Sequence, residues 1–315
     1  MPRADFALAL LRLGGVGRVT AHRVLAHFAS PEALRATPRE QVRLRLKGAP
    51  RAEATVAKLF GADLDEALDA ARAQTRALAP KGVAVLASGD AGWPAGLDAL
   101  PAADRPVCLW RYGHAGALAR GAAPEVRETI APEAQETAAP EAPALAVLGR
   151  AGLPPAAFEA AQRLARAHAA GGVVTGAKDG FDLAVQKTAV GAGARVVAVA
   201  PCGLAKLAPS LRPGATAVVK AGGALVSPFP MGHGPFDHDE REAALVAAAV
   251  ARALAASGGG AGAGSPEAKA LAWARGAGRP VADLDATGAE AAIAAALAPG
   301  AAPEASGAPG PESAP

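Results

Sequence analysis

Apolar residues recur at two different spacings along the chain. In residues 4–79 they follow a helical spacing, for example at Leu8 and Leu11 and again at Val24 and Phe28. From residue 81 onward, short apolar runs bounded by Gly, Pro and Asp replace the helical pattern, and such runs are typical of β-strands. The pattern therefore predicts an all-helical module over 1–80, followed by a segment at 81–113 that leads into a sheet.

The clearest pattern, over residues 144–298, is an alternation of apolar strands with helices. Strands are predicted at 145–149, 173–175 and 195–200, with weaker ones at 217–219 and 224–226, and helices at 155–169, 180–190, 240–250, 266–277 and 288–297. Such alternation predicts the α/β class, with a Rossmann-like parallel sheet and helices on both of its faces. Ligands of these sheets bind outside the carboxyl ends of the strands.

Two segments have a composition that does not suit a packed core. Within residues 114–143 the triplet Ala-Pro-Glu recurs every eight residues, starting at positions 123, 131 and 139, with almost no bulky apolar neighbour. Residues 299–315 are similar. Regularly spaced proline without apolar side chains predicts a disordered insertion at 114–143 and a disordered tail at 299–315.

The composition adds limits on the class of protein. Alanine accounts for 90 of the 315 residues, which leaves a thin set of larger apolar side chains, and the pI near 9.1 reflects 24 Arg against 8 Lys. Residues 1–80 hold 13 basic and 8 acidic side chains, and residues 81–315 hold 19 and 21, so the basic excess is N-terminal. No long apolar run or signal-peptide pattern is present, and two cysteines without metal-site spacing favour neither disulfides nor zinc. We expect a cytoplasmic protein with no membrane contact, metal or cofactor.

A glycine turn at residues 14–17 separates the first two predicted helices. In a helix-hairpin-helix or SAM-like module, such a turn leaves backbone N–H groups at the start of the second helix free to bind a phosphate. Alternatively, it is only a tight connection within a small helical bundle. The sequence leaves both interpretations open.

The loops after the predicted strands offer a second candidate site. Gly149-Arg150 lacks the GxGxxG spacing of dinucleotide-binding folds, and the chain has no GxxxxGK[ST] motif, which disfavours nicotinamide and ATP enzymes. Residues 175–180 place a hydroxyl, two glycines and Lys178 before a predicted helix, a combination that suits a phosphate. The predicted phosphate cradle is Gly149, Thr175, Gly176 and Gly180. The alternative is that these glycines serve only the turns.

Taken in order, several segments resemble the DNA-processing protein A (DprA, or Smf) family. The helical glycine-turn module is followed by Trp93-Pro94, where the family usually has Tyr-Pro. The segment 173–190, VVTGAKDGFDLAVQKTAV, is similar to the family's SGxAxGID and AHxxAL run, and residues 196–209 are similar to its strand followed by GLD and YP. Residues 222–241 resemble the stretch that leads to the family's RNR triplet, and residues 262–281 resemble its SGSxxTA end. The resemblance covers residues 5–285 outside the insertion.

This resemblance implies a function in natural transformation (competence) and DNA recombination. Members bind single-stranded DNA, help to load a RecA-type recombinase onto it, commonly form homodimers through the sheet domain, and carry out no covalent chemistry. For this chain the resemblance and the loop positions together predict DNA contacts by six cations: Arg150, Lys178, Lys187, Lys206, Arg212 and Arg241. No catalytic residue is predicted.

The chain also departs from the family pattern. No serine follows Gly149, Gln186 replaces the usual histidine, Ser210 stands where a basic residue is common, and the RNR triplet is replaced by 239–241, Asp-Glu-Arg. Each lost phosphate contact weakens binding to single-stranded DNA and reduces its dependence on salt. We therefore expect DNA binding that is weaker or differently arranged than in the family.

Other functions remain open from the sequence. One is a partner-binding protein that has lost DNA binding, and a less favoured one is a nucleotide phosphoribohydrolase-like enzyme, whose PGGxGT loop has only a partial counterpart at 257–262. The rings of Phe229, His233 and Phe236 could stack on bases or pack locally. His238 lies between two aspartates, but residues adjacent in sequence point in different directions and do not converge on a metal or substrate.

Overall fold

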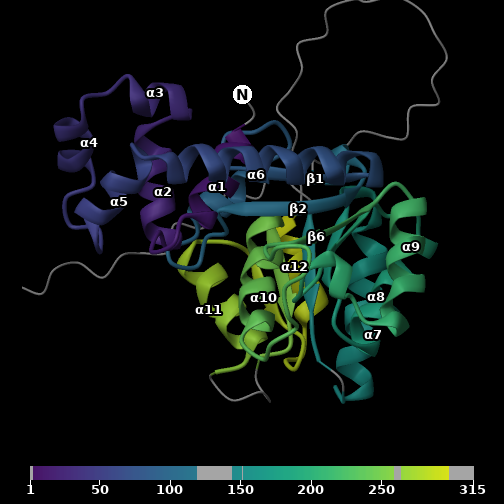
Figure 1. Ribbon diagram of the computed structural model, residues 1–315. Helices are drawn as coiled ribbons and strands as arrows, with labels where there is room; N and C mark the ends of the chain where they lie inside the picture. The colour runs from purple at the N-terminus through teal and green to yellow at the C-terminus, as the bar shows by residue number, and fades with distance from the viewer. Residues whose placement is uncertain (1–2, 119–143, 151, 259–263, 298–315) are drawn as a thin grey trace, which may run out of the picture.

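In the computed structural model, which describes residues 3–118, 144–150, 152–258 and 264–297, eight strands form one sheet in the order β1-β2-β6-β5-β4-β3-β7-β8 (Figure 1). The strands are β1 (Val83–Ala87), β2 (Cys108–Gly113), β3 (Leu145–Leu148), β4 (Val173–Gly176), β5 (Val196–Val199), β6 (Ala224–Ser227), β7 (Ala253–Ala256) and β8 (Val281–Asp283). Strands β3 to β8 pair in parallel, whereas β2 pairs antiparallel with both β1 and β6. The sheet is therefore mixed, with its antiparallel pair at one edge.

The parallel strands are wound in two directions from β3. The chain passes from β3 through β4 and β5 to β6, and then returns to β7 and β8 on the other side of β3. The order of strands thus reverses between β3 and β7, and the crevice at such a reversal is where open α/β sheets bind ligands. The carboxyl ends of these strands point downward in Figure 1.

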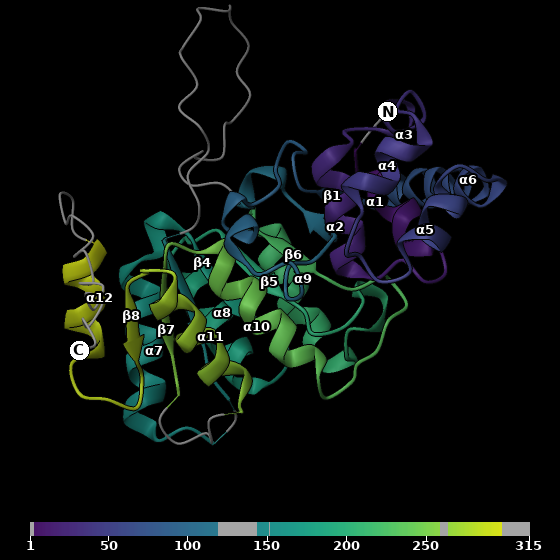
Figure 2. The same cartoon turned by 90° about the vertical axis from the view of Figure 1, so that its left-hand side faces the viewer.

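Alternate residues of the central strands pack against helices on opposite faces of the sheet, as expected for parallel strands buried on both sides (Figure 2). Ala146 and Leu148 of β3 face α10 and α11, whereas Leu145 and Val147 face α7, α8 and α12. The helices of the sheet region are α7 (Pro155–Ala167), α8 (Gly180–Gly191), α9 (Arg212–Lys220), α10 (Asp239–Val250), α11 (Pro266–Gly276) and α12 (Ala289–Leu297). None of the helices in the described ranges is long and apolar enough to cross a membrane.

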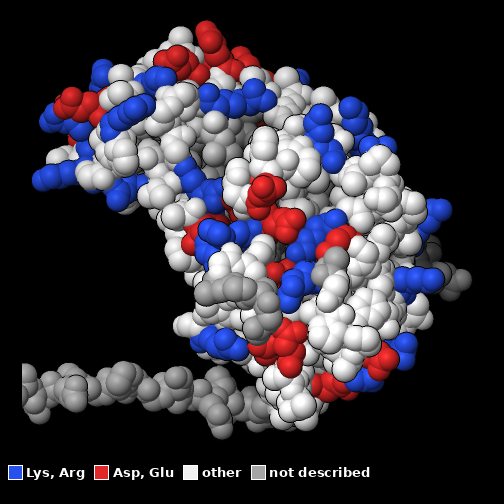
Figure 3. Space-filling view, turned by 90° about the horizontal axis from the view of Figure 1, so that it is seen from below, with Lys and Arg blue, Asp and Glu red and all other residues white. Residues whose placement is uncertain are grey.

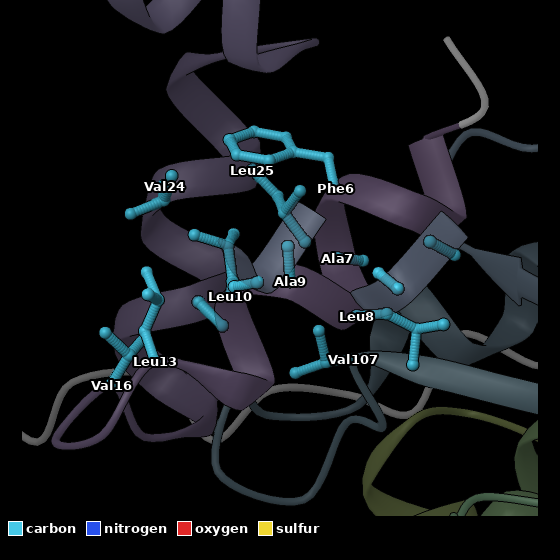
Figure 4. Close-up of a cluster of buried hydrophobic side chains, with 14 of the residues drawn as sticks. Phe6, Ala7, Leu8, Ala9, Leu10, Leu13, Val16, Val24, Leu25 and Val107 are labelled. Atoms are coloured by element: carbon cyan, nitrogen blue, oxygen red, sulfur yellow. The ribbon is translucent and has the colours of Figure 1, made fainter. Parts of the chain in front are cut away.

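Six helices precede the sheet: α1 (Arg3–Arg12), α2 (Arg18–His27), α3 (Pro31–Arg35), α4 (Arg39–Arg45), α5 (Ala52–Leu59) and α6 (Ala62–Leu78). Their buried side chains form one cluster with residues of β1 and β2. Phe6 and Leu10 belong to the same core as Val83 and Trp110, and Figure 4 shows this cluster around α1, with Val107 at its edge. The predicted boundary at residue 80 falls between α6 and β1, two elements that share this hydrophobic core.

The structure corrects several element predictions. Residues 217–219, predicted as a strand, lie in α9, which has Pro213 in its first turn and ends before Gly222 and Gly223. Strands β7 and β8 were not predicted: β7 is an alanine-rich run, ALAA, and β8 has three residues. Ala115–Leu118 form a short 3₁₀ helix with Ala117 and Leu118 buried, so ordered structure extends into the predicted insertion. The rest of the predicted insertion and the whole predicted tail lie outside the described residues.

Candidate nucleic-acid interface

The carboxyl ends of β3, β4, β5 and β6 bring four loops together on one face of the molecule. Figure 3, which views the protein from below Figure 1, shows acidic and basic side chains intermixed at the centre of this face, with the helical module at its edge. The strand ends hold Gly149-Arg150 after β3, residues 177–180 after β4, residues 200–206 after β5 and the loop 228–238 after β6. The sheet therefore assembles most of the predicted site from distant parts of the sequence.

Lys178, in the loop after β4, is engaged by two carboxylates. Its Nζ donates to Glu267 at 2.6 Å and lies 3.4 Å from Glu240, and its side chain is 17% exposed. Burial alone would lower the pKa of Lys178, but the hydrogen bond and the charge of Glu267, together with Asp182 and Glu240, raise the pKa above its ordinary value. Because the neighbouring carboxylates balance the charge of this ammonium, it attracts a DNA phosphate only weakly.

The predicted phosphate cradle is likewise occupied by the chain itself. Asp179 caps α8 and accepts the N–H groups of Phe181 and Asp182 at 2.9 and 3.2 Å, where a bound anion would otherwise lie. The hydroxyl of Thr175 is fully buried and donates to the carbonyl of Gly176 at 2.9 Å. We therefore leave Thr175 and Gly180 out of the proposed DNA contacts.

Gly149 and Gly176 have packing roles at the same place. A Cβ on Gly149 would lie 2.5 Å from the ring of Phe181, and a Cβ on Gly176 would lie 2.5 Å from Oδ2 of Asp182. A Cβ at either position would force the Phe181 ring or the Asp182 carboxylate to move, because real Cβ atoms essentially never approach other atoms so closely. These two glycines keep α8 close to the strand ends.

Four aromatic rings of loop 228–238 form a ladder, defined here as Phe229, His233, Phe236 and His238. Phe229 stacks on His233 with centroids 4.7 Å apart, His233 meets Phe236 edge to face at 5.2 Å, and Phe236 stacks on His238 at 5.8 Å. Asp239, the first residue of α10, braces the ladder: its Oδ2 lies 3.0 Å from His233 Nε2 and accepts the Phe236 N–H at 3.0 Å. The inner ring, Phe229, is buried, whereas Phe236 is 54% exposed. The outer end of the ladder, Phe236 and His238, thus presents aromatic rings to solvent.

Three of the predicted cations are exposed on the loop after β5 and on the helices that follow β5 and β6. Lys206 follows a loop whose Gly203 and Ala205 N–H groups donate to the carbonyls of His233 and Met231, which ties the two loops together. Arg212 begins α9, and Arg241 lies on α10, two residues beyond the brace. All three side chains are exposed, and those of Arg212 and Arg241 donate to the backbone carbonyls of Leu207 and Gly264 at 3.3 and 3.4 Å.

The remaining two predicted contacts lie elsewhere. Arg150 lines a separate groove of about 620 Å³ between α7 and α12, where Arg163, Asp285 and Glu290 also lie. Lys187 is on the outer surface of α8, beside Phe158 and Arg166 of α7. The structure therefore divides the six predicted cations: Lys206, Arg212 and Arg241 are exposed on segments that follow β5 and β6, Lys178 is paired with carboxylates, and Arg150 and Lys187 lie on other surfaces.

The glycine turn of the helical module lies between α1 and α2, as predicted. Lys58 Nζ donates to the carbonyl of Gly14 at 2.7 Å, and Gly17 precedes α2 without a side-chain cap. Arg18, the first residue of α2, forms two hydrogen bonds with the carboxylate of Glu242 on α10, at 2.8 and 2.7 Å. The start of α2 is thus fastened to the sheet region, and its phosphate role stays a prediction.

Sequence reasoning missed the acidic residues of this face. Asp182 is buried and its pKa is raised to about 7, mainly by burial and then by the charge of Asp179. Glu240 and Glu267 come from α10 and α11 and meet at Lys178. Asp182 stands at the aspartate of the segment that resembles SGxAxGID, which was an available signal. The partners of Lys178 are 62 and 89 residues away from it and follow only from the fold.

The fold defines the class: a Rossmann-like α/β protein with a helical module packed on its antiparallel sheet edge. It is similar to the crystal structure of DNA processing protein A (DprA) from Streptococcus pneumoniae, with a TM-score of 0.54 and 15% identity over 85% of this chain and 86% of that one. A DprA structure from Helicobacter pylori, which concerns the single-stranded DNA binding mode of that protein, matches with a TM-score of 0.46 and 17% identity over 63% of this chain and 79% of that one. The sequence matches no family model and no curated protein. The resemblance predicted from the sequence is thus confirmed at the level of the fold.

Proposed function

We propose that the chain is a divergent DprA-like protein that binds single-stranded DNA in the cytoplasm and carries out no covalent chemistry. The observation that carries the proposal is the aromatic ladder at the carboxyl ends of the strands, together with three exposed cations, Lys206, Arg212 and Arg241, on the segments that follow β5 and β6. The fold, shared with a DprA structure over most of both chains, supports the same function. In the proposed complex, bases stack on Phe236 and His238, because every base offers a flat face to an aromatic ring.

The phosphates of the proposed complex contact Lys206, Arg212 and Arg241. Three phosphate contacts predict a weak salt dependence, with a slope of log K against log salt of about −2 for single strands. Lys178 contributes little, because Glu267 and Glu240 hold its ammonium. Stacking therefore supplies a larger share of the affinity than charge.

Fluorescence anisotropy of a labelled oligo-dT, titrated between about 50 and 300 mM salt, tests the proposal. Phe236→Ala should weaken binding about 10-fold or more, since stacking contributes about 1–3 kcal/mol per base. Leu44→Ala is the matched control, because Leu44 is a 65% exposed apolar side chain on the helical module. Equal affinities of Phe236→Ala, Leu44→Ala and the unmodified protein would remove the ladder from the site.

A charge-reversal pair maps the path of the phosphates. Arg241→Glu should weaken binding and reduce the salt slope by roughly one unit. Lys187→Glu on the outer surface of α8 should leave both unchanged, since Lys187 lies away from the ladder. The reverse result would move the DNA path to the groove between α7 and α8.

Loading of a RecA-type recombinase and homodimerisation, implied by the family resemblance, complete the proposal. In a recombinase assay on single strands coated with a single-strand-binding protein, addition of the chain should shorten the lag before filament growth. Phe236→Ala should lose this effect together with DNA affinity. Sedimentation velocity tests the dimer directly, and a monomer at all concentrations would contradict that part.

A second candidate is a partner-binding protein that has lost DNA binding. It is favoured by the acidic residues that neutralise Lys178 and by the pairing of Arg18 with Glu242, both of which withdraw cations from solvent. No binding to oligo-dT at the lowest salt, with retained acceleration of the recombinase, would select this candidate. Incubation with nucleoside monophosphates, with detection of released base, tests the phosphoribohydrolase alternative. Among the described residues no group of three or more His, Cys, Asp and Glu side chains could hold a metal ion.

A further inference from the structure

A small recess opens between the carboxyl ends of β3, β4 and β5 and the first turns of α10 and α11. Its walls are largely apolar or bare backbone, and four ionisable side chains line it: Lys178, Asp182, Glu240 and Glu267. The space inside is about 20 Å³, which is room for one group of the size of a water molecule. The recess can therefore admit a single small polar group, but not a whole base or a phosphate.

Asp182 leaves a hydrogen-bond acceptor unused at this recess. Its side chain is 1% exposed, and its Oδ2 accepts the N–H of Lys178 at 2.9 Å. Its Oδ1 is buried and has no hydrogen-bond partner among the described residues. Buried polar atoms are nearly always hydrogen-bonded in folded proteins, so an unpaired carboxylate oxygen beside a recess marks a place for a donor.

The charges around the recess exclude an anion. Three carboxylates surround one ammonium, and two of them, Glu240 and Glu267, are within 3.4 Å of it. A phosphate oxygen in this space would face carboxylates without a free cation to balance them. A group that donates hydrogen bonds and carries no negative charge is the chemistry that fits.

The recess and the proposed stacking surface share the first turn of α10. Asp239 holds the rings of His233 and Phe236, and Glu240, the next residue of α10, lines the recess. In the proposed complex, a nucleotide next to one that stacks on the ladder lies at the same strand ends as Asp182.

We propose that the recess receives one amino group of a DNA base, the exocyclic amine of adenine or cytosine, as hydrogen-bond donor to Asp182. This inference rests on the proposed function, since it concerns the same strand ends. Carboxylates accept hydrogen bonds from base amines in known protein–DNA contacts. Thymine carries no amino group, so the recess gives the protein a preference among bases where a stacking ladder alone gives none.

The test compares two oligomers that differ only in the amino group. In an oligo-dT of fixed length, every third residue is replaced either by deoxyadenosine or by purine 2′-deoxyriboside, which is adenine without its amine. Anisotropy at about pH 8.5, where Asp182 with its pKa of about 7 is ionised, should show about 10-fold tighter binding of the adenine oligomer, the discrimination typical of one hydrogen bond to a charged group. Equal and measurable affinities would overturn the inference alone, whereas no binding of either oligomer at low salt would overturn the proposed function with it.

Two variants assign the preference to Asp182. Asp182→Asn keeps an acceptor for the Lys178 N–H but can turn an amide N–H₂ toward the recess, and it should reduce the adenine preference to about one-fold or invert it. Asp63→Asn is the matched control, because Asp63 is an exposed aspartate on α6 that does not line the recess. The wild-type comparison decides the inference even if Asp182→Asn fails to fold. Putrescine tests the recess for free amines. If putrescine raises the melting temperature only when Asp182 is present, and the two oligomers bind equally, then the recess binds free amines and the base preference is overturned.

Discussion

Replacing Asp182 by asparagine should stabilise the protein above neutral pH. The ordinary pKa of an aspartate is near 3.8, and burial together with the charge of Asp179 raises the pKa of Asp182 to about 7 in the folded state. Between pH 4 and 7 the unfolded chain has released this proton while the folded chain still holds it, so the wild type loses stability as pH rises through this range. The shift of roughly three pH units corresponds to about 4 kcal/mol.

Asparagine has no proton to release in this pH range, so the free energy of unfolding of the variant does not contain this pH-dependent loss. The difference in free energy of unfolding, Asp182→Asn minus wild type, should therefore grow by about 1.4 kcal/mol per pH unit between pH 4 and 7 and level off above pH 7. Urea unfolding curves at half-unit steps from pH 4 to 8 measure it. Glu66→Gln, at an exposed carboxylate of α6, should give a flat difference over the same range. A flat or falling difference for Asp182→Asn would refute the reasoning that burial holds the proton on Asp182.

Two further predictions concern the contact between the helical module and the sheet. Leu10→Ala should lower the free energy of unfolding by about 2–5 kcal/mol, because Leu10 is fully buried in the core shared with β1 and β2. Calorimetry should show one unfolding transition shifted to lower temperature, and a separate early transition would contradict a shared core. Arg18→Ala should lower the free energy of unfolding by about 1–3 kcal/mol, because it leaves the largely buried Glu242 unpaired. Urea unfolding of the double variant with Glu242→Gln should recover part of that loss, and additive losses would exclude the pair as a source of stability.

The main layers of the fold could be predicted from the sequence. Val173-Val174 and Val196-Val197 are β-branched runs between helical segments, and these became β4 and β5. The run Ala253–Ala256 gave no such signal, because alanine has low strand propensity and only burial between β3 and β8 makes it a strand. The strand predicted at residues 217–219 was wrong for the opposite reason. Val218 and Val219 are β-branched and suggest a strand, but Val218 packs on the sheet as part of a helix.

The candidate site was less predictable than the fold. Lys178 was correctly placed at a strand end, but its charge state in the site depends on Glu240 and Glu267, which only the packing of α10 and α11 brings near. The ladder depends in the same way on Asp239, whose carboxylate orders rings that a sequence can only place in one loop. Composition and spacing locate chemical groups along the chain, whereas neutralisation and stacking depend on contacts between distant segments.

The two described residues that flank positions 119–143 both lie at the amino ends of the parallel strands. Leu118 closes a 3₁₀ helix that packs on β5 and β6, and the N–H of Ala144 donates to Gly171 just before β4. Gly113, at the end of β2, pairs with Ala224 at the start of β6. The amino ends of the strands are at the opposite end of the sheet from the aromatic ladder. An affinity tag, a fluorophore or a surface tether inserted between residues 119 and 143 would therefore attach at the amino ends and leave the carboxyl ends of the strands accessible to ligands in solution.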